Sequence, residues 1–343
     1  MRSGKTSRVI TVVVVGYALG MALVAVAVAM AGDSNALGML LLFGPRWLLV
    51  FPWALLVPLS LAARRWVTAT AIVGSVVTLF QASGFEIPSL NSRRSAMGSG
   101  AGAGKALRVV TYNTDRAATL APRIVTDLLA WDADVIVMQD CAPEVAAAMR
   151  AARTRYQLFR ESEFCIAARL PMRSPVQLHG SRNQGRAVLF SVEWQGAPIR
   201  IGTVHLPSPR TALWAARRGS GDLLEESVQQ RAVASGAIAA WMREGERGPI
   251  VVAGDFNLPV ESQALRRDWR WLRNAFSDAG WGFGHTMFAG RHRVRIDHVL
   301  VSREFTVRGA RVLRGFPSEH QPVVAELEIM RRSRKPSVPK KQE

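Results

Sequence analysis

The chain has 343 residues, which is enough for one large domain or two ordinary ones. Its formal net charge of +18 favours anionic partners such as phosphate esters, nucleic acid or acidic lipid headgroups, although a composition rich in Arg and Ala explains it equally well. The two cysteines, Cys141 and Cys165, form no Cys-x-x-Cys or Cys/His cluster, which argues against a structural zinc site. We interpret both as reduced core residues. A disulfide is the alternative in an extracytoplasmic domain, but their spacing does not support one.

Three apolar segments near the N-terminus predict a membrane anchor. Residues 9–32 carry no charge and are long enough to cross a bilayer as a helix. A signal peptide is the competing interpretation, but further apolar segments would not normally follow one. Residues 47–63 and 66–85 are also uncharged, although the former is short and contains two prolines. We therefore expect about three transmembrane helices within residues 1–94. The absence of charged residues from these segments favours an anchor over a transporter.

The basic residues around these segments predict their orientation. Arg2, Lys5 and Arg8 precede the first segment, and Arg64 and Arg65 lie between the second and the third. Basic residues next to membrane spans favour the cytoplasmic side. We therefore expect a multi-pass cell-membrane protein with its N-terminus inside and the chain after the third crossing extracytoplasmic.

Composition also predicts the limits of the remaining domain. Residues 95–104 consist almost entirely of Gly, Ala and Ser and predict a flexible linker. Residues 331–343 are basic and contain too few apolar residues to fold, so we expect a disordered tail. One folded domain is therefore expected over residues 105–330.

Within this domain, apolar runs and their periodicity predict more strands than helices. Helices are expected at residues 122–131, 143–152 and 223–242, the last being long and amphipathic. Strands are expected at residues 106–111, 134–139, 164–168, 186–194, 198–205, 250–253, 295–301, 306–313 and 322–328. Many strands with few helices between them indicate a mixed α+β sandwich and not an alternating parallel fold.

Polar side chains recur at the ends of these strands. Taken singly, such residues are most often turn or capping residues. Loops at one rim of a sheet nevertheless carry function disproportionately, and oxygen ligands suit a hard cation, Mg²⁺ above all. The candidates are Asn113, Asp140, His205, Asp255, Asn257, Asp297, Glu319 and His320.

The order of these residues and their neighbours is more specific than any one of them. The series Thr111-Tyr112-Asn113, Met138-Gln139-Asp140, Thr203-Val204-His205-Leu206, Gly254-Asp255-Phe256-Asn257, Ile296-Asp297-His298-Val299 and Ser318-Glu319-His320-Gln321-Pro322 resembles the motif series of the deoxyribonuclease I-like endonuclease/exonuclease/phosphatase superfamily. The matches fall in that family's order and cover nearly all of residues 105–330. The resemblance implies a four-layer αββα sandwich, with two β-sheets flanked by helices, and a divalent-metal-dependent phosphoesterase.

The resemblance also implies which residues bind the metal. Asn113 and Asp140 match the family's metal-site pair, and Glu319 falls where the family has a metal-contacting aspartate. Asp140 is one methylene shorter than the usual glutamate, and Glu319 is one methylene longer than the usual aspartate. The charge is kept in both cases, but the reach of each side chain changes by about 1.5 Å. The implied cofactor is Mg²⁺, with Mn²⁺ as the alternative.

The remaining matches imply the catalytic residues. His205 matches the histidine that contacts the scissile phosphate, and Asp255 the carboxylate that positions or activates the attacking water. Asn257 matches the amide that steadies the phosphoryl oxygens. His320 matches the second catalytic histidine, which Asp297 would orient.

The expected function is therefore hydrolysis of a phosphodiester or phosphomonoester bond at the membrane surface. Nucleic acid and phospholipid or inositol-phosphate substrates are both open. Arg210, Arg217, Arg218 and Trp214 suit a phosphate chain and a stacked base, although a solvated loop is the stronger interpretation. The alternative function, suggested by the two altered ligands, is a catalytically weak or inactive membrane-anchored module that binds an anionic ligand. The sequence indicates no protein partner.

Overall fold

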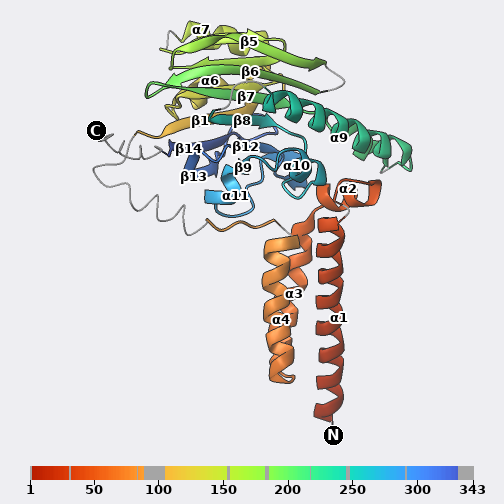
Figure 1. The fold of residues 1–343 in the computed structure, drawn as a ribbon. Helices are drawn as coiled ribbons and strands as arrows, with labels where there is room; N and C mark the ends of the chain where they lie inside the picture. Colours follow the sequence, from red (N-terminus) through yellow and green to blue (C-terminus); the bar gives the residue numbers. More distant parts are fainter. Residues whose placement is uncertain are drawn as a thin grey trace, which may run out of the picture.

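A helical shaft at the N-terminus carries a larger α+β domain (Figure 1). The computed structural model describes residues 2–30, 32–82, 84–88, 105–152, 155–181, 185–216, 218–244, 248–289 and 292–330. The predicted linker, residues 95–104, and the predicted tail, residues 331–343, lie outside these ranges.

Two six-stranded sheets form the centre of the larger domain. The first contains, in spatial order, β13 (Phe305–Val312), β14 (Val323–Ile329), β1 (Leu107–Asn113), β2 (Val135–Gln139), β4 (Phe164–Ala168) and β3 (Gln157–Glu161). The second contains β5 (Met172–Ser181), β6 (Gly185–Trp194), β7 (Ala197–His205), β8 (Ile250–Asp255), β12 (Asp297–Val301) and β9 (Arg273–Asn274). A separate hairpin pairs β10 (Met287–Ala289) with β11 (His292–Val294).

Helices cover the outer face of each sheet, which gives four layers. The first sheet is covered by α6 (Ala121–Leu129) and α7 (Pro143–Ala151), and the second by α9 (Asp222–Arg243) and α10 (Gln263–Asp268). Shorter helices are η3 (Ala118–Leu120), α8 (Arg210–Ala216) and α11 (Ala275–Ala279). The predicted α+β class and αββα sandwich are therefore confirmed.

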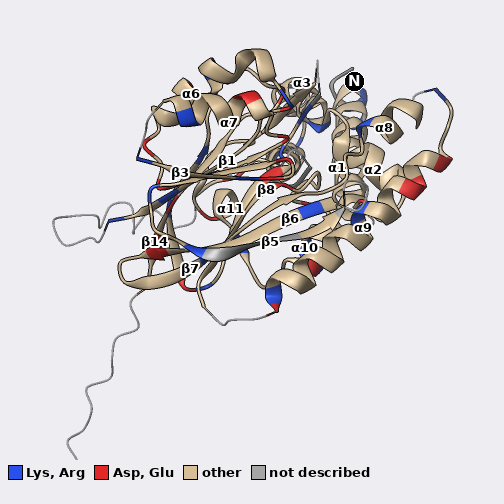
Figure 2. Cartoon of the chain, turned by 90° about the horizontal axis from the view of Figure 1, so that it is seen from above, with Lys and Arg blue, Asp and Glu red and all other residues tan. Residues whose placement is uncertain are grey.

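The central strands are buried on both faces, which explains their unbroken apolar sequences. In β1, Val109 packs between the two sheets whereas Val110 packs under the helices. In β8, Val251 and Ala253 likewise face the other sheet and Val252 faces α9 and α10. Charged residues lie mostly on the outer faces of helices and in loops (Figure 2).

The predicted elements of the domain all form, with ends that differ by a few residues. Strands β3, β5 and β9, the β10–β11 hairpin and the short helices η3, α8, α10 and α11 were not predicted. Their sequences lack a long periodic pattern; β3, for example, reads Gln-Leu-Phe-Arg-Glu and lies at the edge of its sheet.

The N-terminal part contains α1 (Arg2–Met30), α2 (Ala36–Phe43), η1 (Arg46–Val50), α3 (Phe51–Ser60), α4 (Arg65–Val77) and η2 (Thr78–Ala82). Among the described residues, one helix, Gly4–Met30, is long and apolar enough to cross a membrane. A second candidate span exists only if two helices, Ala36–Phe43 and Leu48–Ser60, are counted as one. These two helices are bent by 78° relative to each other. The apolar helix Arg65–Phe80 is shorter. All three predicted apolar segments are therefore helical, but only the first has the length of a complete span.

The shaft is fixed to the α+β domain by buried contacts. Asp33, just after α1, accepts hydrogen bonds from the Ser262 hydroxyl at 2.6 Å and from the Gln263 backbone amide at 2.8 Å. Arg46 forms an ion pair of 2.8 Å with Glu261, and both side chains are nearly buried. An apolar cluster joins Met39, Leu42 and Phe43 of α2 to Leu224, Val228, Val294 and Ile296. The helical shaft and the α+β domain are thus one packed body, although their contact was not predicted.

Candidate active site

The register of three strands brings polar residues together at one edge of the second sheet. Strands β7 and β8 are parallel, and their last residues, His205 and Asp255, are paired. Strand β12 lies antiparallel on the other side of β8, with Asp297 opposite Asp255. Asp255 therefore lies between the two neighbouring strands at the point where β8 ends.

Hydrogen bonds hold the Asp255 carboxylate in place, and its residue is almost fully buried. Asn113 of β1 donates from Nδ2 to Oδ2 of Asp255 at 2.9 Å, which links the two sheets. The backbone amide of Asn257 donates to Oδ1 at 2.9 Å. The Asn257 backbone is left-handed, with φ 47°, a conformation that Asn tolerates better than most residues. Its side-chain Nδ2 donates to the Leu206 carbonyl at 2.9 Å, so Asn257 positions Asp255 and the end of β7.

Two histidine–carboxylate pairs flank Asp255. His205 places Nδ1 3.0 Å from Oε1 of Glu163 and Nε2 3.7 Å from Oδ2 of Asp255. His320 places Nδ1 2.9 Å from Oδ2 of Asp297 and Nε2 3.9 Å from the same Asp255 oxygen. In each pair the carboxylate accepts a hydrogen bond from Nδ1 and so fixes which ring nitrogen faces Asp255.

These carboxylates shift the pKa values of the histidines. Burial alone lowers the pKa of His320, but Asp297 and Asp255 outweigh it and raise the pKa to about 9. Burial also opposes protonation of His205, yet the hydrogen bond to Glu163 and the charge of Asp255 raise its pKa. Burial and the nearby Asp297 carboxylate raise the pKa of Asp255. The two histidines are thus easier to protonate, and Asp255 is harder to ionise, than the same side chains in water.

Glu163 is a site residue that the sequence analysis missed. It lies in the turn between β3 and β4, forms its hydrogen bond with His205, and lies 3.3 Å from the Arg186 guanidinium. Burial raises the pKa of Glu163, but His205 and Arg186 reverse this and hold it below its usual value. No strand-end motif marks this turn, so the sequence offered no signal for it.

The residues that the resemblance assigned to the metal do not all converge. Asp140, Glu163 and His205 offer donor atoms within 4.8 Å of one another. Asp140 has a left-handed backbone, with φ 45°, and is paired with Arg116 at 3.0 Å. Glu319 lines the same pocket but is paired with Arg210 instead of joining this group. Among the described residues, the group of possible metal ligands that contains Asp140 therefore includes Glu163 and not Glu319.

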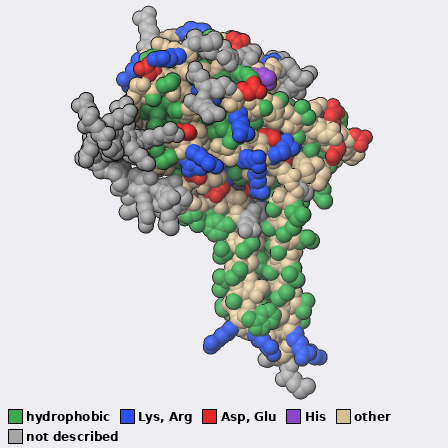
Figure 3. Space-filling model, in the orientation of Figure 1, with side chains coloured by type: hydrophobic (Ala, Val, Ile, Leu, Met, Phe, Trp, Pro, Cys, Tyr) green, Lys and Arg blue, Asp and Glu red, His purple; other side chains and the backbone are tan. Residues whose placement is uncertain are grey.

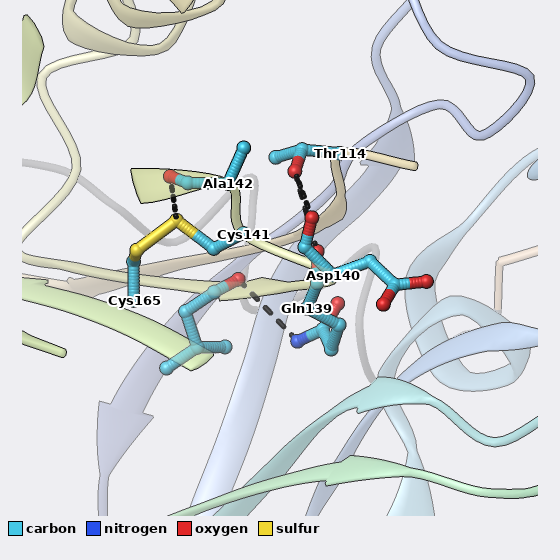
Figure 4. Close-up of a disulfide and its surroundings, with 7 residues drawn as sticks. Thr114, Gln139, Asp140, Cys141, Ala142 and Cys165 are labelled. Atoms are coloured by element: carbon cyan, nitrogen blue, oxygen red, sulfur yellow. Dashed lines mark hydrogen bonds between the residues drawn. A yellow bond between two sulfur atoms is a disulfide. The ribbon is translucent and has the colours of Figure 1, made fainter. Parts of the chain in front are cut away.

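Cys141 and Cys165 form a disulfide directly beside Asp140 (Figure 4). The interpretation of both as reduced cysteines was therefore wrong. Strands β2 and β4 are antiparallel neighbours with Met138 opposite Cys165, and this pairing brings the two cysteine Cα atoms to 5.8 Å. The spacing of 24 residues along the chain does not reveal that register. The disulfide joins the segments that carry Asp140 and Glu163.

Breaking this disulfide is expected to destabilise the domain. Removing a disulfide that closes a loop of this length lowers the free energy of unfolding by about 3 kcal/mol. For a domain of this size, that corresponds to a fall in Tm of roughly 6–12 °C. Thermal unfolding of the full chain with and without reductant measures the effect. A Cys141→Ser/Cys165→Ser variant serves as the control, since reductant should lower the Tm of the wild type but not that of the variant. Equal Tm values for wild type and variant would contradict the prediction.

The site opens into one pocket of about 660 Å³. It is lined by seven of the eight predicted site residues, Asn113, Asp140, His205, Asp255, Asn257, Glu319 and His320. Asp297 lies behind His320. Residues Arg210–Ala216 form α8, not the solvated loop that was expected, and Trp214 of this helix lines the pocket. The guanidinium of Arg218 lies 3.4 Å from the Trp214 ring centre. Arg217 lies outside the described residues.

Comparisons with known proteins agree with this fold. The model of the Endonuclease/Exonuclease/phosphatase family matches residues 110–320. No sequence among the curated proteins matches the chain.

Similar solved structures include zebrafish (D. rerio) TDP2 in complex with a single-strand DNA product, with TM-score 0.53 and 14% identity, covering 66% of this chain and 100% of that one. A mannosyl-6-phosphatase from Bacteroides thetaiotaomicron has TM-score 0.50 and 17% identity, with 65% and 100% covered. The 3' phosphatase NExo from Neisseria, bound to a product DNA hairpin, has TM-score 0.50 and 20% identity, with 65% and 99% covered. At these identities the likeness establishes the fold.

Proposed function

The chain belongs to the endonuclease/exonuclease/phosphatase family, a family of phosphoester hydrolases, and we propose that the cluster around Asp255 is its active site. One observation carries this proposal: the Nε2 atoms of His205 and His320 both face the same oxygen of Asp255, at 3.7 and 3.9 Å. A buried carboxylate between two oriented imidazoles suits the transfer of protons to and from a phosphoester.

In the proposed reaction, water attacks phosphorus and the alcohol leaves. Asp255 accepts a hydrogen bond from the water and takes its proton. His320, which holds a proton on Nε2, gives it to the leaving oxygen. Asp297 accepts the Nδ1–H hydrogen bond and stabilises the imidazolium form of His320, which carries a proton on both ring nitrogens. His205 is proposed to donate a hydrogen bond to a phosphoryl oxygen, with Glu163 orienting it in the same way.

A divalent cation fits beside these residues. Asp140 and Glu163 offer carboxylate oxygens next to the pocket, and Asn113 offers an amide oxygen, a donor set suited to Mg²⁺ or Mn²⁺. The arginine paired with Asp140, Arg116, is largely exposed and can give way to a cation. A bound cation would neutralise charge on the phosphoryl oxygens and act as a Lewis acid. Glu319 remains a proposed further ligand, once released from Arg210.

Removing the metal is expected to abolish hydrolysis. The full chain in detergent would be assayed with bis-p-nitrophenyl phosphate in Mg²⁺, in Mn²⁺ and in chelator, with nitrophenolate release as the readout. Activity should be lost in chelator and return on adding Mg²⁺. The full chain is required because the isolated domain would leave Glu261, which Arg46 neutralises, buried without its ion pair. Equal rates in Mg²⁺ and in chelator would contradict the proposal.

The binding-module alternative rests on the ion pairs of Asp140 with Arg116 and of Glu319 with Arg210. Arginines that hold both carboxylates can compete with a cation. A folded chain that binds a phosphate ester but releases no nitrophenolate at any Mg²⁺ or Mn²⁺ concentration would favour this alternative.

We further propose that the helical shaft is embedded in a membrane. Its surface is covered by apolar side chains (Figure 3), including Leu19 and Leu23 of α1, which are 66% and 70% exposed. A core helix of a soluble protein would bury such residues. α1 also packs on α3 and α4 through Val14, Met21, Trp53, Val67 and Ala71. This packing supports α1 as a permanent part of the fold, in place of a cleaved signal peptide, and supports a multi-pass anchor.

The proposed orientation places the α+β domain outside the cytoplasm. Lys5 and Arg8 lie in the first turns of α1, and Arg64 and Arg65 lie at the start of α4. Both helices start at the end of the shaft that is far from the domain, where Figure 3 shows basic side chains. Basic residues favour the cytoplasmic side, and disulfides persist in oxidising compartments. A reporter enzyme that works only outside the cytoplasm should therefore be active when it is fused after Glu343. If only a reporter that works in the cytoplasm is active at the same position, the orientation is the reverse of the proposed one.

A further inference from the structure

Part of the apolar lining of the active-site pocket comes from the N-terminal helices. Near Asp255 and His320 the pocket is polar, whereas Leu40, Phe43 and Pro45 line another part of it. Leu40 and Phe43 belong to α2, the short helix that follows α1. The rest of the apolar lining comes from α8 and from residues 287–296, through Leu213, Trp214, Met287, Val294 and Ile296.

Helix α2 is apolar on its outward face as well as on its buried face. Met39 and Phe43 are buried against the α+β domain. Leu37 and Leu40 point outward and are 69% and 45% exposed. A helix with apolar residues on both faces, directly after a proposed membrane span, suits the boundary between bilayer and water. Leu40 thus belongs both to the surface that faces this boundary and to the lining of the pocket.

An exposed aromatic residue supports the same placement. Trp281 of the α+β domain is 65% exposed and packs edge-on against Phe85, with ring centres 5.7 Å apart. Phe85 follows η2, where the third apolar helix leaves the shaft. Tryptophans of membrane proteins gather at this interface. The underside of the domain, close to the shaft, therefore suits contact with lipid headgroups.

The charge of the pocket argues against a nucleic acid. A groove for a nucleic acid strand needs several unpaired cations along the backbone and open aromatic faces. Among the described residues that line this pocket, Arg210 is the one arginine or lysine, and it is paired with Glu319. The Trp214 ring is already covered by Arg218. Apolar lining, not positive charge, is what the pocket adds to the catalytic cluster.

Resting on the function proposed above, we propose that the substrate is a membrane lipid phosphoester. Its phosphate lies between Asp255 and the two histidines, and its hydrocarbon chain lies along α2 and α8 and leaves beside Leu40 for the bilayer. The volume of about 660 Å³ suits a headgroup together with the first part of a chain, and exceeds what a phosphate alone requires.

The test compares two diesters that differ in chain alone. The full chain in detergent micelles would be given p-nitrophenyl methyl phosphate and p-nitrophenyl hexadecyl phosphate in Mg²⁺. We expect kcat/KM to be at least about tenfold higher for the hexadecyl ester, because its chain is buried on binding. The long ester also concentrates in the micelle that holds the protein, which raises its apparent kcat/KM without any contact in the pocket. The preference is therefore measured again in variants of the pocket lining.

Two leucines of α2 provide a matched pair. Leu40→Gln should lower the hexadecyl-to-methyl ratio of kcat/KM by roughly fivefold or more, whereas Leu37→Gln should leave the ratio unchanged. Both residues are exposed on the same helix, so micelle partitioning affects both variants equally, but only Leu40 lines the pocket. Trp214→Gln, on α8, tests the other wall and keeps the proposal testable if Leu40→Gln does not fold.

The outcomes separate the two proposals. If neither ester is hydrolysed, the proposed function and the lipid substrate fall together. If the methyl ester is hydrolysed but the ratio is close to one, or is unchanged in both Leu40→Gln and Trp214→Gln, only the lipid substrate is overturned. A higher kcat/KM for a p-nitrophenyl nucleotide diester than for the hexadecyl ester would overturn it in favour of a nucleic acid.

Discussion

Changing Asp255 to asparagine is expected to lower kcat for phosphodiester hydrolysis by on the order of 10³-fold or more. The amide has the shape of the carboxylate but cannot take a proton from water. It also places an NH₂ group against Asn113 or Asn257, each of which donates a hydrogen bond of 2.9 Å to Asp255. The two histidines lose the common anion that both face.

This loss should come without loss of folding. Burial and Asp297 raise the pKa of Asp255, which means that the ionised carboxylate is unfavourable in the folded state. A neutral amide removes that cost, which offsets the hydrogen bond lost to Asn113 or Asn257, so Tm is expected to change little.

Steady-state kinetics and thermal unfolding of the same preparation measure both effects. Asp127→Asn is the matched control, because Asp127 is a partly exposed carboxylate on α6, where it forms a surface ion pair with Arg123. It should change neither kcat nor Tm appreciably. An Asp255→Asn protein that is folded and retains more than a tenth of the wild-type kcat would exclude Asp255 from the chemical step.

The parts of the site that the sequence predicted share a local cause. Asn113, His205 and Asp255 end strands whose apolar runs are visible in the sequence. His205 and Asp255 end neighbouring strands of the second sheet, and Asn113 ends a strand of the first sheet that packs against it. The order of the motifs then implied the αββα sandwich. The register of β8 with β7 and β12, which brings His205 and Asp297 opposite Asp255, follows from that fold and not from any single motif.

The missed features depend on contacts between distant segments. Glu163 reaches His205 across 42 positions of the chain, from a turn with no pattern of its own. The disulfide depends on the pairing of β2 with β4, and the docking of the helical shaft on the α+β domain depends on a buried ion pair between Arg46 and Glu261. Each is decided by the register of strands or by the docking of helices. The hydrophobic periodicity of a single segment determines neither the register of strands nor the docking of helices.

The position of the anchor changes how the site should be understood. A flexible linker after a membrane anchor would let the domain move freely, and the pocket would then be independent of the bilayer. Instead Asp33 and Arg46 fix the shaft beneath the domain, and α2 forms part of the pocket wall. If the proposed membrane embedding holds, the same helix would place the domain at the bilayer and contribute to the wall that a substrate contacts.

Changing Asp297 to asparagine is expected to reduce kcat by about 10²- to 10⁴-fold, although Asp297 is not among the pocket-lining residues. Asp297 accepts the Nδ1–H hydrogen bond of His320, at 2.9 and 3.1 Å from its two oxygens. The Thr286 hydroxyl accepts a hydrogen bond of 3.0 Å from the Asp297 backbone amide, which keeps the start of β12 in place. Asparagine is neutral and can turn its NH₂ toward Nδ1, so the protonated His320 ring would lose both its hydrogen-bond acceptor and the charge that stabilises it.

A double-mutant cycle separates this positioning role from a general structural one. If Asp297 acts through His320, then His320→Ala and the double variant His320→Ala/Asp297→Asn should have nearly the same kcat, because the carboxylate has no ring left to orient. If Asp297 only supports the fold, the two substitutions should multiply, and Tm should fall with Asp297→Asn. The pH profile adds a second readout. Asp297 helps to raise the pKa of His320 to about 9, so Asp297→Asn should move the alkaline limb of the kcat profile toward lower pH, and an unchanged limb would argue against the pair.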